Sequence, residues 1–145
     1  MEWTNIMNTQ RLVLILFAFT FVFAPQSFRN AVAQQNGPRY TAKLVSPKPG
    51  EIVMPGTVKR IEWKANFPDV DLNMCETEIM LSVDGGRTFT FITNQRNPNV
   101  RYFDWIVPRT PTNDAILDIR FGCLGIFPET SSRQFQSRFV ISSMD

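Results

Sequence analysis

Short runs of β-branched and aromatic residues, separated by clusters of turn-forming residues, constrain the fold of this chain most. From residue 40 onward these runs alternate with Pro, Gly, Asn and Asp clusters every dozen or so residues, and no stretch keeps a helical period for three turns. This pattern is typical of all-β domains. It predicts seven strands, at Tyr40–Ser46, Val58–Ala65, Thr77–Val83, Thr88–Thr93, Arg101–Val107, Ile116–Cys123 and Gln134–Ser142.

Alternation of apolar and polar residues divides each predicted strand into two faces. In the second strand, Ile61 and Trp63 share one face, and the polar residues between them take the other. One apolar face per strand is what two antiparallel sheets packed face to face require, so we expect a seven-stranded β-sandwich. Lys59 falls in the inward phase, which indicates that its strand begins later or carries a bulge. The predicted core includes Ile61, Trp63, Leu81, Phe103, Trp105, Ile119 and Phe139.

An apolar run near the start of the chain predicts that the protein is exported from the cytoplasm. Leu12–Ala24 reads LVLILFAFTFVFA, follows a basic residue and ends at Pro25. About 18 apolar residues are needed to span a bilayer, so this run is too short for a transmembrane helix and has the length of a signal-peptide core. The small residues Ala31 and Ala33 suit signal peptidase and predict cleavage before Gln34.

These boundaries predict a signal peptide at 1–33, a flexible polar lead-in at 34–39 and a β-sandwich domain at 40–145. The mature protein is then secreted or periplasmic, without a membrane span. An uncleaved anchor is the alternative, because Glu2 offsets the positive charge that precedes the apolar run.

Composition excludes several functional classes. The chain has no His, which removes Ser-His-Asp and Cys-His catalysis and every histidine metal ligand. Its two Cys cannot form a zinc site of four thiolates. Fifteen Lys and Arg against 13 Asp and Glu leave a net charge of +2 without basic clusters, so we expect no nucleic-acid partner and no cofactor or metal.

The strand carboxylates do not suggest catalysis either. Glycosidase chemistry needs two carboxylates about 5–10 Å apart in a cleft. Each acidic residue predicted to lie in a strand is the only carboxylate on the polar face of that strand. A small sandwich also lacks long loops to enclose a substrate. We therefore expect no enzyme activity from Glu62, Glu78, Asp104 or Asp118.

Several motifs resemble a known family when they are taken in order. They are GTVKRIEWKA, EIMLSVDGGRTFTFI, YFDWIVP, AILDIRF and FVISS. The series resembles the immunoglobulin-like or fibronectin-III-like modules of secreted proteins, and it is similar to the N-terminal module of fungal cell-wall glucan-assembly proteins and to bacterial accessory domains. The resemblance covers nearly all of 40–143 and departs at Lys59, where such modules usually have an apolar residue. It implies an immunoglobulin-like sandwich and leaves function open, because such modules host unrelated binding roles.

The resemblance also implies a disulfide. Cys75 and Cys123 are the only cysteines, and both alternate in step with the apolar, inward-facing residues of their strands. In an immunoglobulin-like order these strands are the third and the sixth, antiparallel neighbours in one sheet, so the start of one meets the end of the other. A disulfide between Cys75 and Cys123 follows for an oxidising compartment, and two free buried thiols are the alternative.

One hairpin matches the Asp-box pattern S-x-D-x-G-x-T-[FW], which resembles the repeated hairpins of sialidases and related propellers. Within it Asp84 can accept hydrogen bonds from turn amides, and Phe89 can tuck under the hairpin. A propeller needs several copies, whereas this chain has one. A calcium site at Asp84 is the alternative, although only one carboxylate is nearby. We interpret Ser82, Asp84, Gly85, Gly86, Thr88 and Phe89 as a structural hairpin whose glycines adopt positive φ.

Two hypotheses for function remain. The first is a secreted interaction or structural module that binds a protein or cell-envelope partner through loops or a strand edge. The second is a carbohydrate-binding protein of the cell wall or matrix. Trp63 and Trp105 share a face with aliphatic residues, which favours core packing over sugar stacking and leaves Tyr102, Phe67 and Phe127 as the more exposed aromatic candidates.

Overall fold

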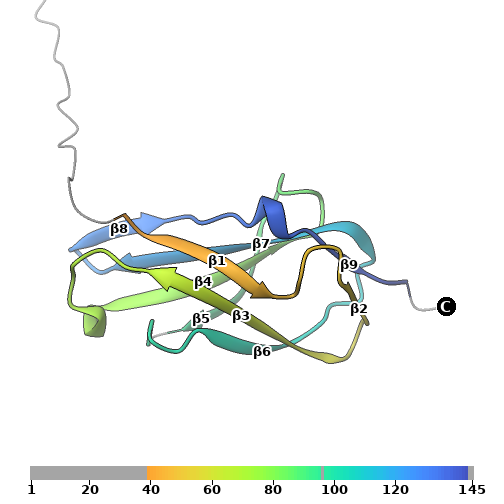
Figure 1. Ribbon diagram of the computed structural model, residues 1–145, viewed down its shortest axis with the longest axis horizontal. Coiled ribbons are helices and arrows are strands. Elements are labelled where there is room, and N and C mark those ends of the chain that lie inside the picture. Colours follow the sequence, from red (N-terminus) through yellow and green to blue (C-terminus); the bar gives the residue numbers. More distant parts are fainter. Residues whose placement is uncertain (1–38, 96, 144–145) are drawn as a thin grey trace, which may run out of the picture. The chain divides into compact units, whose positions relative to one another are not determined.

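Nine β-strands provide most of the regular structure of the residues that the computed structural model describes, 39–95 and 97–143 (Figure 1). The strands are β1 (Thr41–Ser46), β2 (Ile52–Val53), β3 (Val58–Asn66), β4 (Cys75–Ser82), β5 (Thr90–Gln95), β6 (Tyr102–Ile106), β7 (Thr112–Cys123), β8 (Phe127–Thr130) and β9 (Phe139–Ile141). Two short 3₁₀ turns, Leu72–Met74 and Phe135–Ser137, accompany them. The fold is therefore all-β, as the sequence predicts. The predicted signal peptide, its cleavage site and residues 34–38 of the lead-in lie outside the described residues.

The strands form two sheets. The smaller sheet has the order β1-β3-β6, and the larger sheet has the order β2-β9-β7-β4-β5 with β8 also paired to β7. All neighbours are antiparallel except β2 and β9, which run parallel. None of the helical turns among the described residues is long and apolar enough to cross a membrane.

Among the described residues, the structure has nine strands where the sequence predicts seven, and several boundaries differ. β2 and β8 were not expected, because one has only two residues and the other contains Pro128. The predicted strand Ile116–Cys123 begins four residues earlier, at Thr112, because its first residues pair with β9. The predicted strand Gln134–Ser142 is wrong at its start, since a 3₁₀ turn leaves only Phe139–Ile141 as strand. The predicted strand Thr88–Thr93 begins two residues later, because Thr88 is bonded within the preceding turn.

Apolar side chains from both sheets form the main core. Six predicted core residues are buried there, and Phe103 is partly buried and packs against them. Burying one such side chain completely contributes about 1.5–3 kcal/mol. The main core comprises Leu44, Val53, Ile61, Trp63, Ile79, Leu81, Trp105, Val107, Ala115, Leu117, Ile119, Phe139 and Ile141.

Lys59 causes no bulge in its strand, so the expectation of a late start or a bulge is wrong. β3 begins at Val58 and pairs with β6 in unbroken register through Glu62. The Lys59 ammonium forms an ion pair with Glu51, in the segment before β2, so the charge keeps a partner although the side chain is partly buried. The register shift of this sheet lies in β1, before Ser46.

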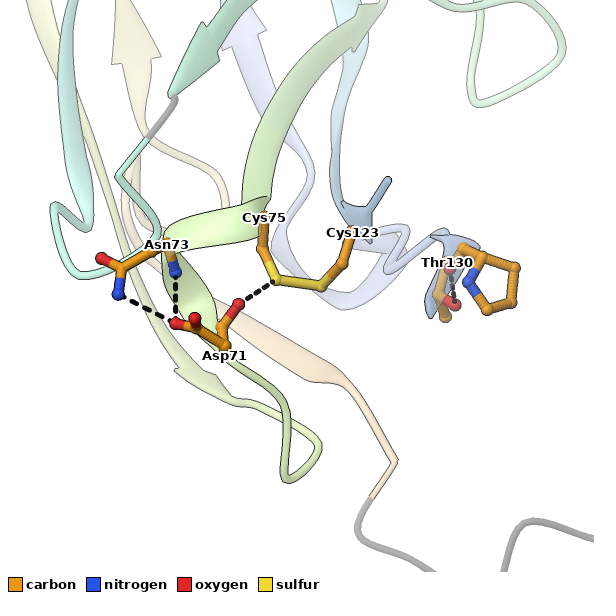
Figure 2. Close-up of a disulfide and its surroundings, with 6 residues drawn as sticks. Asp71, Asn73, Cys75, Cys123 and Thr130 are labelled. Atoms are coloured by element: carbon orange, nitrogen blue, oxygen red, sulfur yellow. Dashed lines mark hydrogen bonds between the residues drawn. A yellow bond between two sulfur atoms is a disulfide. The ribbon is translucent and has the colours of Figure 1, made fainter. Parts of the chain in front are cut away.

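A disulfide joins the start of β4 to the end of β7, as predicted (Figure 2). Cys75 lies directly opposite Cys123 in the ladder, with their Cα atoms 4.0 Å apart. Beside it, the rings of Tyr40 and Phe67 lie 5.1 and 4.8 Å from the ring of Phe121, between centroids. The disulfide therefore closes a second, aromatic core at this end of the sandwich.

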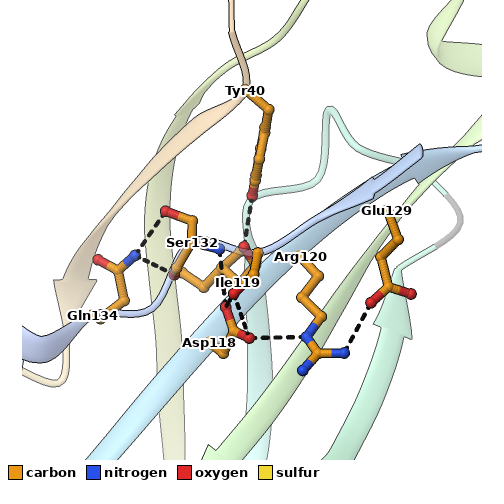
Figure 3. A network of polar contacts seen from close by, with 8 residues as sticks. Tyr40, Asp118, Ile119, Arg120, Glu129, Ser132 and Gln134 are labelled. Atoms are coloured by element: carbon orange, nitrogen blue, oxygen red, sulfur yellow. Dashed lines mark hydrogen bonds and ion pairs between the residues drawn. The ribbon is translucent and has the colours of Figure 1, made fainter. Parts of the chain in front are cut away.

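Polar side chains, one buried and one partly buried, connect the two sheets along one side of the sandwich (Figure 3). The backbone N–H of Leu44, in edge strand β1, donates to Gln134 Oε1 at 2.9 Å, and that of Ala42 donates to Ser132 Oγ at 3.1 Å. The Ala42 carbonyl accepts from both side chains at 3.1 Å. Ser132 and Gln134 are themselves bonded through their backbones to β7, so they link β1 to the larger sheet.

Asp118 holds this connecting segment in place. Its carboxylate is completely buried and accepts hydrogen bonds from Ser131 Oγ at 2.8 Å and from the Ser132 N–H at 2.9 Å. Arg120 lies 2.8 Å from the same carboxylate and 2.8 Å from Glu129, so the buried charge is paired as well as hydrogen-bonded. A buried carboxylate is tolerated only with such partners.

Removing the disulfide is expected to destabilise the fold. In the chain-entropy model, a crosslink across 48 residues contributes about 4 kcal/mol to the free energy of unfolding. We expect the double variant Cys75→Ala/Cys123→Ala to unfold at much lower urea concentration, and wild type to approach it in reductant. Equal urea midpoints for wild type with and without reductant would contradict the assignment.

Candidate interaction surface

The turn between β4 and β5 is organised by one carboxylate. Asp84 Oδ1 accepts hydrogen bonds from the backbone N–H groups of Arg87 at 3.1 Å and Thr88 at 3.0 Å. It also accepts from Ser82 Oγ at 2.7 Å, and Asp84 Oδ2 accepts from Thr88 Oγ1 at 2.6 Å. Ser82 Oγ in turn accepts from the Gly86 N–H at 2.8 Å. The short side chains therefore replace backbone pairing inside the turn.

Two glycines give this turn its shape. Gly85 and Gly86 have φ values of 75° and 92°, which other residues rarely adopt. A Cβ on Gly86 would also lie 2.6 Å from Cε1 of Phe135, so glycine is needed for this close approach. Phe89 is partly exposed, with the Arg133 guanidinium carbon 5.1 Å from its ring centroid.

The hydrogen bonds from Thr88 and Ser82 lower the pKa of Asp84 well below its usual value, because they stabilise the ionised carboxylate. Both carboxylate oxygens are engaged by groups of the same turn. In the part of the chain that the structure describes, no group of three or more acidic or cysteine side chains is arranged to hold a metal ion. These hydrogen bonds of Asp84, two from backbone N–H groups and two from hydroxyl groups, are thus made within its own turn.

Apolar side chains beside this turn form a patch on the outer face of the larger sheet. Phe91 lies opposite Met80 in the ladder between β5 and β4 and is 54% exposed. Phe135, 45% exposed, leans over the Gly86 turn, and Phe89 lies between the turn and β5. We call these four side chains, Met80, Phe89, Phe91 and Phe135, the outer-face patch.

The sequence did not indicate this patch. Phe91 stood in a predicted strand without an assigned face, and Phe135 stood in a predicted strand that is a 3₁₀ turn. Alternation alone could not place them, because both lie at interruptions of the strand geometry. The clearest signal was the recurrence of Phe at 89 and 91, directly after the glycine turn.

The other aromatic candidates lie elsewhere. Trp63 and Trp105 are 2% and 6% exposed and belong to the core. Phe67 and Phe127 are partly buried against the aromatic core near the disulfide, so they are more exposed than the two tryptophans, and Phe127 lies in β8 rather than in a loop. Tyr102 is exposed, on the outer face of the smaller sheet.

The four strand carboxylates are not gathered into one cleft. Glu62 and Asp104 lie on the smaller sheet, where Arg60 holds Asp104 by two contacts of 2.8 Å. Glu78 and Asp118 lie on the larger sheet. Partial burial, together with the negative charges nearby, raises the pKa of Glu78.

A groove on the larger sheet passes beside Glu78. Near the disulfide it is lined by Glu76 and Glu129, with the apolar side chains of Met74 and Leu124 at the strand ends. Arg120 also lines this groove and is held by its ion pairs with Asp118 and Glu129. Its charge is therefore committed to the buried network described above.

Comparison with known proteins adds no family to this description. No protein-family model matches the chain, and no curated protein matches it. The function therefore has to be inferred from the described surface and from the compartment that the sequence implies.

The Asp84 turn is expected to affect folding stability in a pH-dependent manner. Because the folded pKa is lowered, the stabilisation is fully present above the unfolded pKa of about 3.9 and is lost as pH falls through the folded value. We expect Asp84→Ala to lower the melting temperature at pH 7, and the difference from wild type to shrink in acid. Asp84→Asn, which keeps one acceptor oxygen, should fall between them. An Asp84→Ala variant that melts like wild type at pH 7 would contradict a structural role.

Proposed function

We propose that this protein is an exported, non-catalytic interaction module of the immunoglobulin-like class that binds a protein or cell-envelope component through the outer-face patch. The exposed patch beside a hydrogen-bonded turn is the observation that carries this proposal. Such a patch on a rigid sheet suits a partner whose own apolar side chains cover it.

The strand order supports the immunoglobulin-like class. Strands β1, β3 and β6 correspond to A, B and E of that fold, while β4, β7 and β9 correspond to C, F and G. β5 then takes the position of C′, next to C. The disulfide differs from that of antibody domains, since it joins two neighbours within one sheet.

Export is supported by two independent features. The apolar run Leu12–Ala24 and the small residues before Gln34 suit a cleaved signal peptide. The Cys75–Cys123 disulfide suits an oxidising compartment, because cytosolic thiols are usually kept reduced. Both features are consistent with a secreted or periplasmic protein.

The positions of exposed aromatics favour a protein partner over a glycan. A sugar platform needs two or three coplanar exposed rings, and both core tryptophans are buried. Tyr102 lies on the smaller sheet, Phe91 lies on β5 of the larger sheet and Phe135 lies in a 3₁₀ turn, so the exposed rings come from three separate elements. The non-catalytic assignment is supported by the partners of one carboxylate on each sheet: Arg60 holds Asp104, and Asp118 is buried among its hydrogen-bond and ion-pair partners.

Site-specific photo-crosslinking in the producing cell tests this proposal. A photoreactive phenylalanine analogue at Phe135 should give a discrete adduct with a protein of the envelope, and the same analogue at exposed Lys64, on the smaller sheet, should not. Phe135→Ser should weaken binding of the captured partner by about tenfold or more. Equal adducts from both positions, or retention of the purified protein on cell-wall polysaccharide that Phe135→Ser abolishes, would contradict it.

A further inference from the structure

The edges of the two sheets differ in how they are protected. The β1 edge is bonded by Ser132 and Gln134. β6 carries the charge of Asp104 at its centre, and its Tyr102 carbonyl accepts a hydrogen bond from Gln95 Nε2 at 3.3 Å. β2 is only two residues long. Covering groups, charges and short strands are three usual protections of a sheet edge, and a β-bulge that twists the edge away is another.

β5 has none of the first three protections, although it carries a β-bulge. Its sequence, TFITNQ, contains neither a charged residue nor Pro. Within residues 39–95 and 97–143, only β4 is hydrogen-bonded to the backbone of Thr90–Gln95. This six-residue strand thus presents an open and neutral edge to another strand.

A β-bulge gives β5 an unusual arrangement of side chains. Phe91 lies opposite Met80 and Thr93 lies opposite Ile79, so Ile92 is an extra residue in the ladder. Ile92 packs against the main core. Two neighbouring residues, Ile92 and Thr93, therefore face inward, where a regular strand would alternate.

The facing pattern of β5 is consequently symmetric about its centre. Residues that are directly opposite in an antiparallel ladder share a face. Three residues of β5 lie opposite inward-facing residues of β4: Thr90 opposite Leu81, Thr93 opposite Ile79 and Gln95 opposite Thr77. Two lie opposite outward-facing residues: Phe91 opposite Met80 and Asn94 opposite Glu78. From Thr90 to Gln95, the side chains face in, out, in, in, out, in.

We infer that two copies of this chain associate by antiparallel pairing of their β5 strands, with a twofold axis between Ile92 and Thr93. Pairing over the whole strand then sets Thr90 opposite Gln95, Phe91 opposite Asn94, and Ile92 opposite Thr93 of the second copy. Both members of each pair share a face, which a regular six-residue strand could not achieve in this register. No charged side chain of either strand meets a like charge. The bulge gives both strands the same local twist, because the twofold axis relates them.

The association joins the larger sheets of two copies into one continuous sheet. Their outer faces become contiguous, and the two Phe91 side chains lie about 10 Å apart along the strand direction. Glu78 lies opposite Asn94, so across the paired strands it lines up with Phe91 and Met80 of the second copy. The two Glu78 carboxylates are therefore offset from each other along the strands. The pairing places two outer-face patches side by side and makes the assembly bivalent. It does not require the proposed partner, so either inference can fail alone.

Sedimentation velocity over a wide range of protein concentration tests the association. Wild type should shift from monomer to dimer as concentration rises. Thr93→Lys places two like charges beside the twofold axis and should leave the protein monomeric. Thr41→Lys adds the same charge at an exposed position on β1 and should dimerise like wild type.

Because Thr93 faces inward, each variant must keep the far-UV circular dichroism spectrum of wild type. If an inward charge unfolds the chain, Phe91→Lys/Asn94→Lys sets lysine opposite lysine at two outward-facing positions and should give a folded monomer.

A charge exchange then tests the pairing itself. Thr93→Glu alone should also be monomeric, and an equimolar mixture with Thr93→Lys should recover the dimer as a mixed species. Wild type that stays monomeric at every concentration would overturn the inference. A dimer that is unchanged by Thr93→Lys, or a mixture that remains monomeric, would overturn it equally.

Discussion

The fold depends on a small group of polar side chains that closes one side of the sandwich. Among the residues that the structure describes, edge strand β1 has no neighbouring strand on its outer side, and the side chains of Ser132 and Gln134 bond its backbone instead. Asp118 fixes the segment that carries them, and it is itself neutralised by Arg120. Unpaired, each of these buried groups would cost about 1–3 kcal/mol, so the network stabilises the fold only as a complete set.

The opposite side of the sandwich is formed by a different pair of edge strands. There β5 and β6 are the outer strands of the two sheets, joined in the chain by residues 96–101. The Asp84 turn leads directly into β5, so its hydrogen bonds determine how the edge and the outer-face patch are presented. The open edge of β5 also carries the exposed Phe91, so the proposed association concerns this side of the molecule, and the outer-face patch extends from Phe91 to Phe135 in the 3₁₀ turn.

The sequence predicted those features that follow from regular alternation. The faces of β3 and β7 could be assigned because Ile61, Trp63 and Ile119 recur at period two, and the family resemblance implied that Cys75 meets Cys123. It did not predict the burial of Gln134. A polar residue in a strand pattern gives no sign that its side-chain amide will hydrogen-bond the backbone of a strand far away in the sequence, as Gln134 does with Leu44.

The interruptions of the strands were equally hard to predict. The bulge at Ile92 depends on how β5 fits against β4, and β2 depends on a neighbour far along the chain. Lys59 looked like a defect of its strand, since its partner Glu51 lies in a different segment. The outer-face patch was missed for the same reason, because Phe91 and Phe135 occupy positions that long-range packing determines.

The contrast between a sealed edge and an open edge is the central claim, and residue-resolved hydrogen exchange of the dilute monomer tests it most directly. The Ala42 and Leu44 amides should be protected like those of a central strand, although they belong to an edge, because Ser132 and Gln134 accept from them. The β5 amides that point away from β4 should exchange rapidly. Fast exchange at Ala42 and Leu44 together with protection of every β5 amide would contradict this account.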